Sequence, residues 1–372
     1  MRGKSSEDLR RPCTGPAVWQ GRDLARSRSW VLRPGPDQRD ELDAAVRSVR
    51  ARGTPLLKVS ADRFPVPSLT ADLARVAAEL ETGRGFVLVR GLPVERYGPA
   101  AAAVLLWGLG RHLGVPVSQN ATGHMLGHLP YRPADLGPQA FHTDDADMLA
   151  LLCLRTSGAP GRMRLASSAA VHNTVLARRP ELVDGLYRTH HLDRHGEQSP
   201  EDLPWHAVPL AHRAGGRLSL RYDRRRLESA RHLPGAPRPD PDDRELFDLI
   251  DASAADPELR LDIALHAGDL LLLNNHAVLH SDAGFANGPC TERGPQALRL
   301  WLTPHRPRAL PEAFWGDAYF SGGARGGVAP LDVITSHKPT TRTTPTTPTT
   351  PTTRNPHDRS ARTPGPIRPT PR

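Results

Sequence analysis

Two apolar, strand-like runs in this chain each lie beside side chains that can bind a metal. The run Met148–Leu154 follows closely on His142 and Asp144, and the run Leu270–Leu273 leads towards His280. In an extended segment, residues i and i+2 point to the same face, so His142 and Asp144 would converge. If all three side chains share one site, both runs must be strands whose ends meet, which restricts the possible folds severely.

One carboxylate and two imidazoles form the 2-His-1-carboxylate facial triad, which holds non-haem Fe(II) and leaves coordination positions open. The competing explanation is a surface turn, because the sequence around Asp144 is polar and acids favour loops. The adjoining apolar runs, and an arginine-bearing run at Leu298–Leu302, favour a site at the mouth of core strands. His142, Asp144 and His280 are therefore candidate metal ligands.

His276 and His280 have the spacing of the zinc-protease motif His-Glu-x-x-His. That motif needs a glutamate directly after the first histidine, and this chain has Ala277 there. The preceding leucines and Asn274-Asn275 favour a strand followed by a turn. We expect His280 to be the ligand and His276 to support the site from outside the coordination sphere.

The middle of the chain mixes helices and strands without a regular βαβ rhythm. Helices are expected near residues 40–50, 99–113 and 240–255, and short strands dominate the second half. This mixture predicts an α+β, mainly β fold, a barrel or sandwich with helical insertions, in preference to a doubly wound sheet.

The two ends of the chain differ in composition from the middle. Residues 1–35 contain Pro12, Pro16 and Pro34 and few apolar clusters, so we expect a poorly ordered extension. Residues 336–372 are rich in threonine and proline, a composition typical of disordered or polyproline-like segments. We expect one catalytic domain over residues 36–335.

The net charge of +9 does not indicate nucleic-acid binding. From Ser336 onward there are seven basic residues and one acid, so +6 of the +9 belongs to the tail. The rest of the chain has no basic stripe interleaved with aromatic side chains, which nucleic-acid-binding surfaces typically show.

Other sequence features also exclude whole classes of protein. No apolar run is long enough to span a bilayer, and the N-terminus lacks the apolar core of a secretory signal. Three widely spaced cysteines indicate neither a disulfide framework nor a zinc cluster. We expect a cytoplasmic protein that binds no membrane, and the sequence leaves its oligomeric state open.

Five segments occur in an order that is characteristic of one protein family. They are Gly83–Gly91, Leu113–Asn120, Phe141–Asp144, Leu272–His280 and Leu298–Leu302. Together they resemble the TauD/TfdA family of Fe(II)- and 2-oxoglutarate-dependent dioxygenases, including its clavaminate-synthase-like group. The resemblance implies a double-stranded β-helix, or jelly-roll, barrel with helical insertions.

The resemblance also implies an activity. His142, Asp144 and His280 would ligate Fe(II), with 2-oxoglutarate and O₂ as cosubstrates and succinate and CO₂ as products. The expected substrate is a small molecule, such as an amino acid or a specialised-metabolism intermediate. Family halogenases lack the carboxylate, so Asp144 favours hydroxylation or a related oxidation.

A buried arginine is expected to bind the distal carboxylate of 2-oxoglutarate. Relatives commonly have an arginine four residues before the position of Arg299, where this chain has Pro295. Arg299 and Arg293 are therefore both candidates, and the alternative for Arg293 is a solvated loop charge. Ser168 resembles a hydroxyl residue that assists 2-oxoglutarate binding, and its alternative is a helix N-cap.

Polar residues on two loops are candidates for the substrate side of the site. Gln119 and Asn120 resemble substrate-side or cosubstrate-side positions, with turn formation as the alternative. Asp145 and Asp147 could pair with a cationic substrate, although exposed loop acids are common.

Two other functions remain open from the sequence. The replacement by Pro295 allows a catalytically weakened relative that serves as a binding protein. A non-haem iron enzyme of the same barrel class that does not use 2-oxoglutarate is the second alternative.

Overall fold

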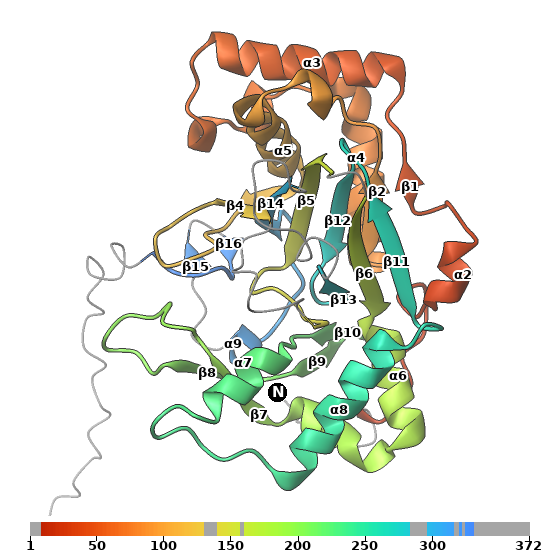
Figure 1. Ribbon diagram of the computed structural model, residues 1–372, viewed down its shortest axis with the longest axis vertical. Coiled ribbons are helices and arrows are strands. Elements are labelled where there is room, and N and C mark those ends of the chain that lie inside the picture. Colours follow the sequence, from red (N-terminus) through yellow and green to blue (C-terminus); the bar gives the residue numbers. More distant parts are fainter. Residues whose placement is uncertain are drawn as a thin grey trace, which may run out of the picture. The chain divides into compact units, whose positions relative to one another are not determined.

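The computed structural model describes residues 9–129, 140–156, 160–282, 296–315, 320–321 and 324–330. Two β-sheets form the centre of this part of the chain, and helices lie on either side of them (Figure 1). Arg293 and Pro295, as well as the Thr/Pro-rich tail, lie outside the described residues.

The larger sheet has seven strands and carries the segment that follows Asp144. Its strands pair in the order β1-β2-β12-β5-β14-β3, and β4 also pairs with β14. Only the β1–β2 pair is parallel among these pairings. The bounds are β1 (Val31–Leu32), β2 (Phe86–Val89), β3 (Gly114–Pro116), β4 (Leu126–Leu129), β5 (Met148–Arg155), β12 (Leu270–Asn274) and β14 (Gln296–Pro304).

The smaller sheet has three strands and carries His280. Its order is β11-β6-β13, with both pairings antiparallel. The bounds are β6 (Gly161–Ser167), β11 (Arg260–Leu265) and β13 (Val278–Ser281).

Alternate residues of both sheets form one apolar core. Leu149 and Leu151 of β5 belong to the same buried cluster as Leu271 of β12 and Met163 and Leu165 of β6. Because successive strand residues point to opposite faces, the side chains of this cluster fill the space between the two sheets. The predicted jelly-roll barrel with helical insertions is confirmed.

The opposite face of the large sheet is covered by helices. Leu152, Leu272 and Leu300 point away from the barrel interior and share a second buried cluster with helical side chains such as Leu105. These strands are therefore apolar on both faces. The covering helices are α3 (Pro36–Ala51), α4 (Thr70–Thr82) and α5 (Pro99–Leu113).

A third buried cluster joins three further helices and a 3-10 segment to two hairpins. Pro180 separates α6 from the 3-10 segment η6, as its missing amide and ring geometry predict. The elements are α6 (Ser168–Arg178), η6 (Pro180–Tyr187), β7 (Thr189–Asp193), β8 (Trp205–Pro209), β9 (Ala211–Ala214), β10 (Arg217–Leu220), α7 (Arg224–Ala230) and α8 (Pro241–Ala255). A short helix, α9 (Glu312–Trp315), follows β14.

The N-terminal segment differs from the poorly ordered extension that its prolines suggested. Its described part contains α2 (Gly21–Ala25), and Val31 of β1 pairs with Leu88 of β2. Trp19 and Trp30 are both buried against Phe86, with ring centroids 5.4 and 5.8 Å away. Long-range burial of two tryptophans thus outweighs the local composition, and residues 9–35 belong to the barrel.

No helix among the described residues has both the length and the apolar character that crossing a membrane requires.

Replacing Trp30 should show that the N-terminal segment is part of the folded domain. Trp30→Ala removes a buried aromatic side chain, so we expect the free energy of unfolding to fall by about 3–5 kcal/mol. Chemical denaturation measures this change. Leu57→Ala is the control, because Leu57 is 63% exposed and should change stability by less than about 0.5 kcal/mol. An unchanged denaturation midpoint for Trp30→Ala would contradict the assignment.

Candidate active site

A short antiparallel bridge brings the two predicted histidine ligands together. The His142 amide donates to the carbonyl of His280 at 3.0 Å, and the His280 amide donates back to the carbonyl of His142 at 2.9 Å. Residues paired in this way place their side chains on one face of the sheet. The two imidazole rings consequently lie with centroids 4.3 Å apart.

Asp144 completes a compact cluster of potential ligand atoms. One nitrogen of His142, one of His280 and a carboxylate oxygen of Asp144 all lie within 4.8 Å of one another. The His142 Nε2 atom is 3.8 Å from Asp144 Oδ1, and the His280 Nε2 atom is 3.6 Å from Asp144 Oδ2. Both histidines are buried. Two imidazole nitrogens and one carboxylate on one side of a centre fit Fe(II) and leave further coordination positions for other molecules.

The surroundings prepare the two histidines to act as ligands. The Nδ1 atom of His142 is 2.9 Å from the Ala140 carbonyl oxygen, so a proton on Nδ1 leaves Nε2 free to bind a metal. Burial, and then the nearby His142 and Arg299, hold the pKa of His280 well below its usual value. A neutral imidazole is the form that binds a metal.

Asp144 is held by a residue of the large sheet and by a residue of the turn between β12 and β13. The indole Nε1–H of Trp301 donates to Asp144 Oδ2 at 2.9 Å. The Asp144 amide donates to Asn275 Oδ1 at 3.3 Å. Trp301 was not among the predicted site residues. It lies two residues from Arg299 on β14, and strand periodicity places both side chains on one face.

Arg299 is the candidate cosubstrate ligand that the structure places beside the triad. Its Nη1 atom is 3.9 Å from Asp144 Oδ1, and its guanidinium lies 4.8 Å from the Trp301 ring centroid. The Nε–H group donates to Gln119 Oε1 at 2.7 Å, and the Gln119 amide donates back to the Arg299 carbonyl at 2.9 Å. Gly127 leaves room for this pair, because a Cβ atom there would lie 2.6 Å from Gln119 Oε1.

Ser168 is not brought to the triad. Its amide binds the Ala277 carbonyl, whereas His280 pairs with Leu165. Ser168 thus lies three residues further along the strand pair, or about 10 Å at the rise of a β-strand. The N-cap of α6 is Ser167, whose hydroxyl accepts the Ala170 amide at 2.9 Å. The N-cap alternative for Ser168 was therefore wrong by one residue. A contact between Ser168 and 2-oxoglutarate stays a prediction, and the buried Ser168 hydroxyl has no hydrogen-bond partner among the described residues.

Asn120 forms a local turn, which was the alternative to a substrate contact. Its side-chain oxygen accepts hydrogen bonds from the Thr122 hydroxyl at 2.7 Å and from the His124 amide at 3.1 Å. The side chain therefore organises residues 120–124.

Asp145 does not offer a free carboxylate to a cationic substrate. Its two oxygens accept hydrogen bonds from Arg221 and Arg226, and the side chain is largely buried. Burial opposes ionisation, but the two arginines outweigh it and hold the pKa of Asp145 below its usual value. The prediction of a substrate contact missed these partners, which come from a distant part of the sequence.

His276 lies outside the cluster of ligand atoms. Its Nε2 atom is 2.7 Å from Asp147 Oδ1, and both side chains are buried. His280 lies on a strand, so the two histidines do not share a helical face as they do in the zinc-protease motif.

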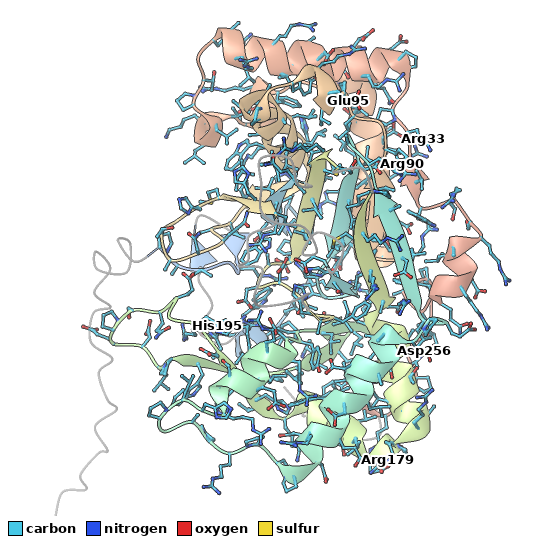
Figure 2. All side chains as sticks on the ribbon, in the orientation of Figure 1. Arg33, Arg90, Glu95, Arg179, His195 and Asp256 are labelled. Atoms are coloured by element: carbon cyan, nitrogen blue, oxygen red, sulfur yellow. The ribbon has the colours of Figure 1, made fainter. Side chains whose placement is uncertain are left out.

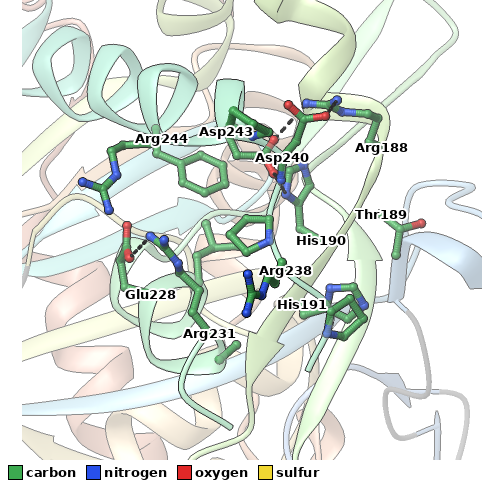
Figure 3. Close-up of a pocket in the computed structure, with 16 residues that line it drawn as sticks. Arg188, Thr189, His190, His191, Glu228, Arg231, Arg238, Asp240, Asp243 and Arg244 are labelled. Atoms are coloured by element: carbon green, nitrogen blue, oxygen red, sulfur yellow. Dashed lines mark hydrogen bonds and ion pairs between the residues drawn. The ribbon is translucent and has the colours of Figure 1, made fainter. Parts of the chain in front are cut away.

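A separate cavity of about 490 Å³ lies among β7, α7 and the start of α8 (Figure 3). Arg188 in its wall is paired with Asp240 and Asp243, and Arg231 is paired with Glu228. The three candidate metal ligands do not line it.

The sequence of this chain is similar to several known proteins. Residues 52–301 match the family described as taurine catabolism dioxygenase TauD, TfdA family. FR-33289 synthase of Streptomyces rubellomurinus (strain ATCC 31215) is 26% identical over 329 residues, which cover 83% of this chain and 97% of that protein. Taurine hydroxylase-like protein SAT17 of Stachybotrys chartarum (strain CBS 109288 / IBT 7711) is 26% identical over 308 residues, covering 76% and 77%.

Solved structures have the same fold. An asparagine oxygenase in complex with Fe(II), 2S,3S-3-hydroxyasparagine and succinate matches with a TM-score of 0.58 and 16% identity, covering 73% of this chain and 93% of that one. The non-heme iron oxygenase OrfP in complex with Fe and alpha-ketoglutaric acid matches with a TM-score of 0.54 and 19% identity, covering 73% and 94%.

The family pattern extends over more than half of the chain, and the barrel places a His-Asp-His cluster at its core. This chain therefore belongs to the TauD/TfdA family of Fe(II)- and 2-oxoglutarate-dependent dioxygenases.

Proposed function

We propose that this dioxygenase holds Fe(II) through His142, Asp144 and His280 and oxidises a small molecule, most simply by hydroxylation. The observation that carries the proposal is the convergence of the three ligand atoms to within 4.8 Å of one another. When bound, iron, 2-oxoglutarate and O₂ supply the oxidising chemistry, with release of succinate and CO₂. The residues of the chain bind and orient these molecules.

Asp144 is held by one contact to its side chain and one to its backbone. The Trp301 indole N–H donates to Asp144 Oδ2, and the side-chain oxygen of Asn275 accepts the backbone N–H of Asp144. Outer contacts of this kind fix a ligand's rotamer and lower the cost of binding the metal.

Arg299 is proposed to bind the distal carboxylate of 2-oxoglutarate. It is close to Asp144, a fifth of its side chain is exposed, and Gln119 fixes its Nε edge. Its Nη atoms can therefore form a charge-assisted pair with a carboxylate. Gln119 acts in this proposal on the cosubstrate side, by holding the arginine in place.

The substrate is proposed to be an amino acid or a specialised-metabolism intermediate. Two solved neighbours hold hydroxylated asparagine or hydroxylated arginine, and one relative is named as a synthase from Streptomyces. A reducing, cytoplasmic location is part of the proposal, and the buried free thiols of Cys13 and Cys153 agree with it.

Metal and cosubstrate binding can be tested without knowing the substrate. Anaerobic protein mixed with Fe(II) and 2-oxoglutarate should develop the metal-to-ligand charge-transfer band of the chelate. His280→Ala removes one of three ligands and should abolish the band, whereas His112→Gln should retain it, since His112 contacts the Phe64 carbonyl instead. No band in the unmodified protein would favour a binding protein or an enzyme that does not use 2-oxoglutarate.

The identity of the anchoring arginine can be tested by substitution. Arg299→Ala should raise the dissociation constant of 2-oxoglutarate about 10–100-fold, because a hydrogen-bonded ion pair contributes about 1.5–3 kcal/mol. Arg293→Ala should leave that constant unchanged. A titration of the charge-transfer band measures both. If Arg293→Ala weakens binding and Arg299→Ala does not, the assignment to Arg299 is wrong.

A further inference from the structure

The loop that joins Asp144 to β5 is held by several buried polar contacts. We propose that Arg325 is a positioning residue for the metal site, which it reaches through Asp147 and this loop. The inference rests on the proposed function, because it assumes that Asp144 is a metal ligand.

Asn275 ties the loop to the turn that leads from β12 to β13, the strand that carries His280. Its side chain accepts the Asp144 amide at 3.3 Å and donates to the Ala146 carbonyl at 2.9 Å, and its own amide donates to the Asp147 carbonyl at 2.9 Å. Asp144, Ala146 and Asp147 are therefore all hydrogen-bonded to Asn275. A displacement of Asp147 must then be transmitted to the backbone of Asp144.

Asp147 is fixed by two cationic or potentially cationic side chains. Arg325 donates from Nε to Oδ2 at 3.0 Å and from Nη2 to Oδ1 at 2.8 Å, and His276 Nε2 is 2.7 Å from Oδ1. Asp147 is 2% exposed. Burial raises the pKa of Asp147, but the contacts with His276 and Arg325 outweigh it and leave the pKa below its usual value. The carboxylate is thus a charged anchor whose position depends on its partners.

Arg325 is itself preorganised. Its backbone N–H and C=O both bind the Thr303 hydroxyl of β14, at 3.0 and 2.7 Å. Its guanidinium lies 5.3 Å from the centroid of the Trp315 ring, which also contacts His276 at 5.5 Å. A guanidinium held at both ends loses little freedom when it forms the forked pair with a carboxylate.

The two residues after Arg325 pack closely against the same loop. The Gly327 amide donates to the Asp145 carbonyl. Gly326 and Gly327 have φ angles of +79° and +74°, and a Cβ atom on Gly326 would lie 2.7 Å from the Asp145 carbonyl oxygen. Only glycine adopts this conformation readily. Residues 325–327 therefore hold the loop through an ion pair, a hydrogen bond and close packing. They lie beyond residues 52–301, the part of the chain that matches the family.

These contacts make the Fe(II) affinity of the site depend on residues 325–327. Without Arg325, the buried Asp147 carboxylate keeps only His276 and must shift to find other partners. Asn275 transmits that shift to Asp144. Loss of a contact behind a metal ligand commonly lowers metal affinity about 10–100-fold.

The test is an anaerobic calorimetric titration of the full chain with Fe(II), combined with the melting temperature of the metal-free protein. Arg325→Met should raise the Fe(II) dissociation constant about tenfold or more. Arg90→Met is the matched control. Arg90 follows β2 (Figure 2) and forms the same forked pair with the buried Asp269, with distances of 3.0 and 2.8 Å, but at the opposite end of β12 from Asn275. The Arg90→Met variant should have a lower melting temperature and an unchanged Fe(II) affinity.

Two further variants keep the test decisive if Arg325→Met folds poorly. Arg325→Lys retains the charge without the fork and should give an intermediate Fe(II) affinity. In an Asp147→Asn background, Arg325→Met should cause no further loss of affinity, because the coupling passes through Asp147.

The outcomes separate this inference from the proposed function. If the unmodified protein binds Fe(II) and the Arg325 variants bind it equally well, the positioning role is overturned and the function stands. The inference also fails if Arg90→Met weakens Fe(II) binding as much as Arg325→Met does. Failure of the unmodified protein to bind Fe(II) overturns the function itself.

Discussion

The antiparallel bridge between His142 and His280 is the interaction on which the rest of the site depends. Two backbone hydrogen bonds of 3.0 and 2.9 Å bring together segments that are far apart in the sequence. The bridge joins the strand of the small sheet to the segment that enters the large sheet as β5, so the two sheets meet at this point. Once the histidines face each other, Asp144, two residues on, can complete the cluster.

Two buried carboxylates lie just behind this bridge, and each is paired with cationic or potentially cationic side chains. Asp145 is held by Arg221 and Arg226, and Asp147 by His276 and Arg325. Removing one partner from such a pair is costly, because it leaves a desolvated charge. The barrel interior next to the site is apolar, so the loop can satisfy its charges only through these partners. The same contacts therefore stabilise the fold and set the position of the candidate metal ligand.

The local pattern of the sequence predicts the main elements and the cluster of candidate ligands. It does not predict the contacts between residues that are far apart in the chain. The helix expected at residues 99–113 has those bounds, and the convergence of Asp144 with the histidines follows from strand periodicity. The N-cap of α6 is Ser167 and not Ser168, because helix N-caps cannot be located to one residue from propensity. The partners of Asp145 and the burial of Trp30 depend on residues far away in the chain, which no local pattern encodes. Family resemblance supplies the ligand set, but not the contacts behind it.

The most direct test of the account is an anaerobic crystal structure of the protein with Mn(II), which does not react, and 2-oxoglutarate. The account predicts the ion bound by Nε2 of His142, Nε2 of His280 and one oxygen of Asp144, with the distal carboxylate of 2-oxoglutarate on Arg299. An ion bound elsewhere in the chain, or a cosubstrate carboxylate on a different arginine, would contradict it.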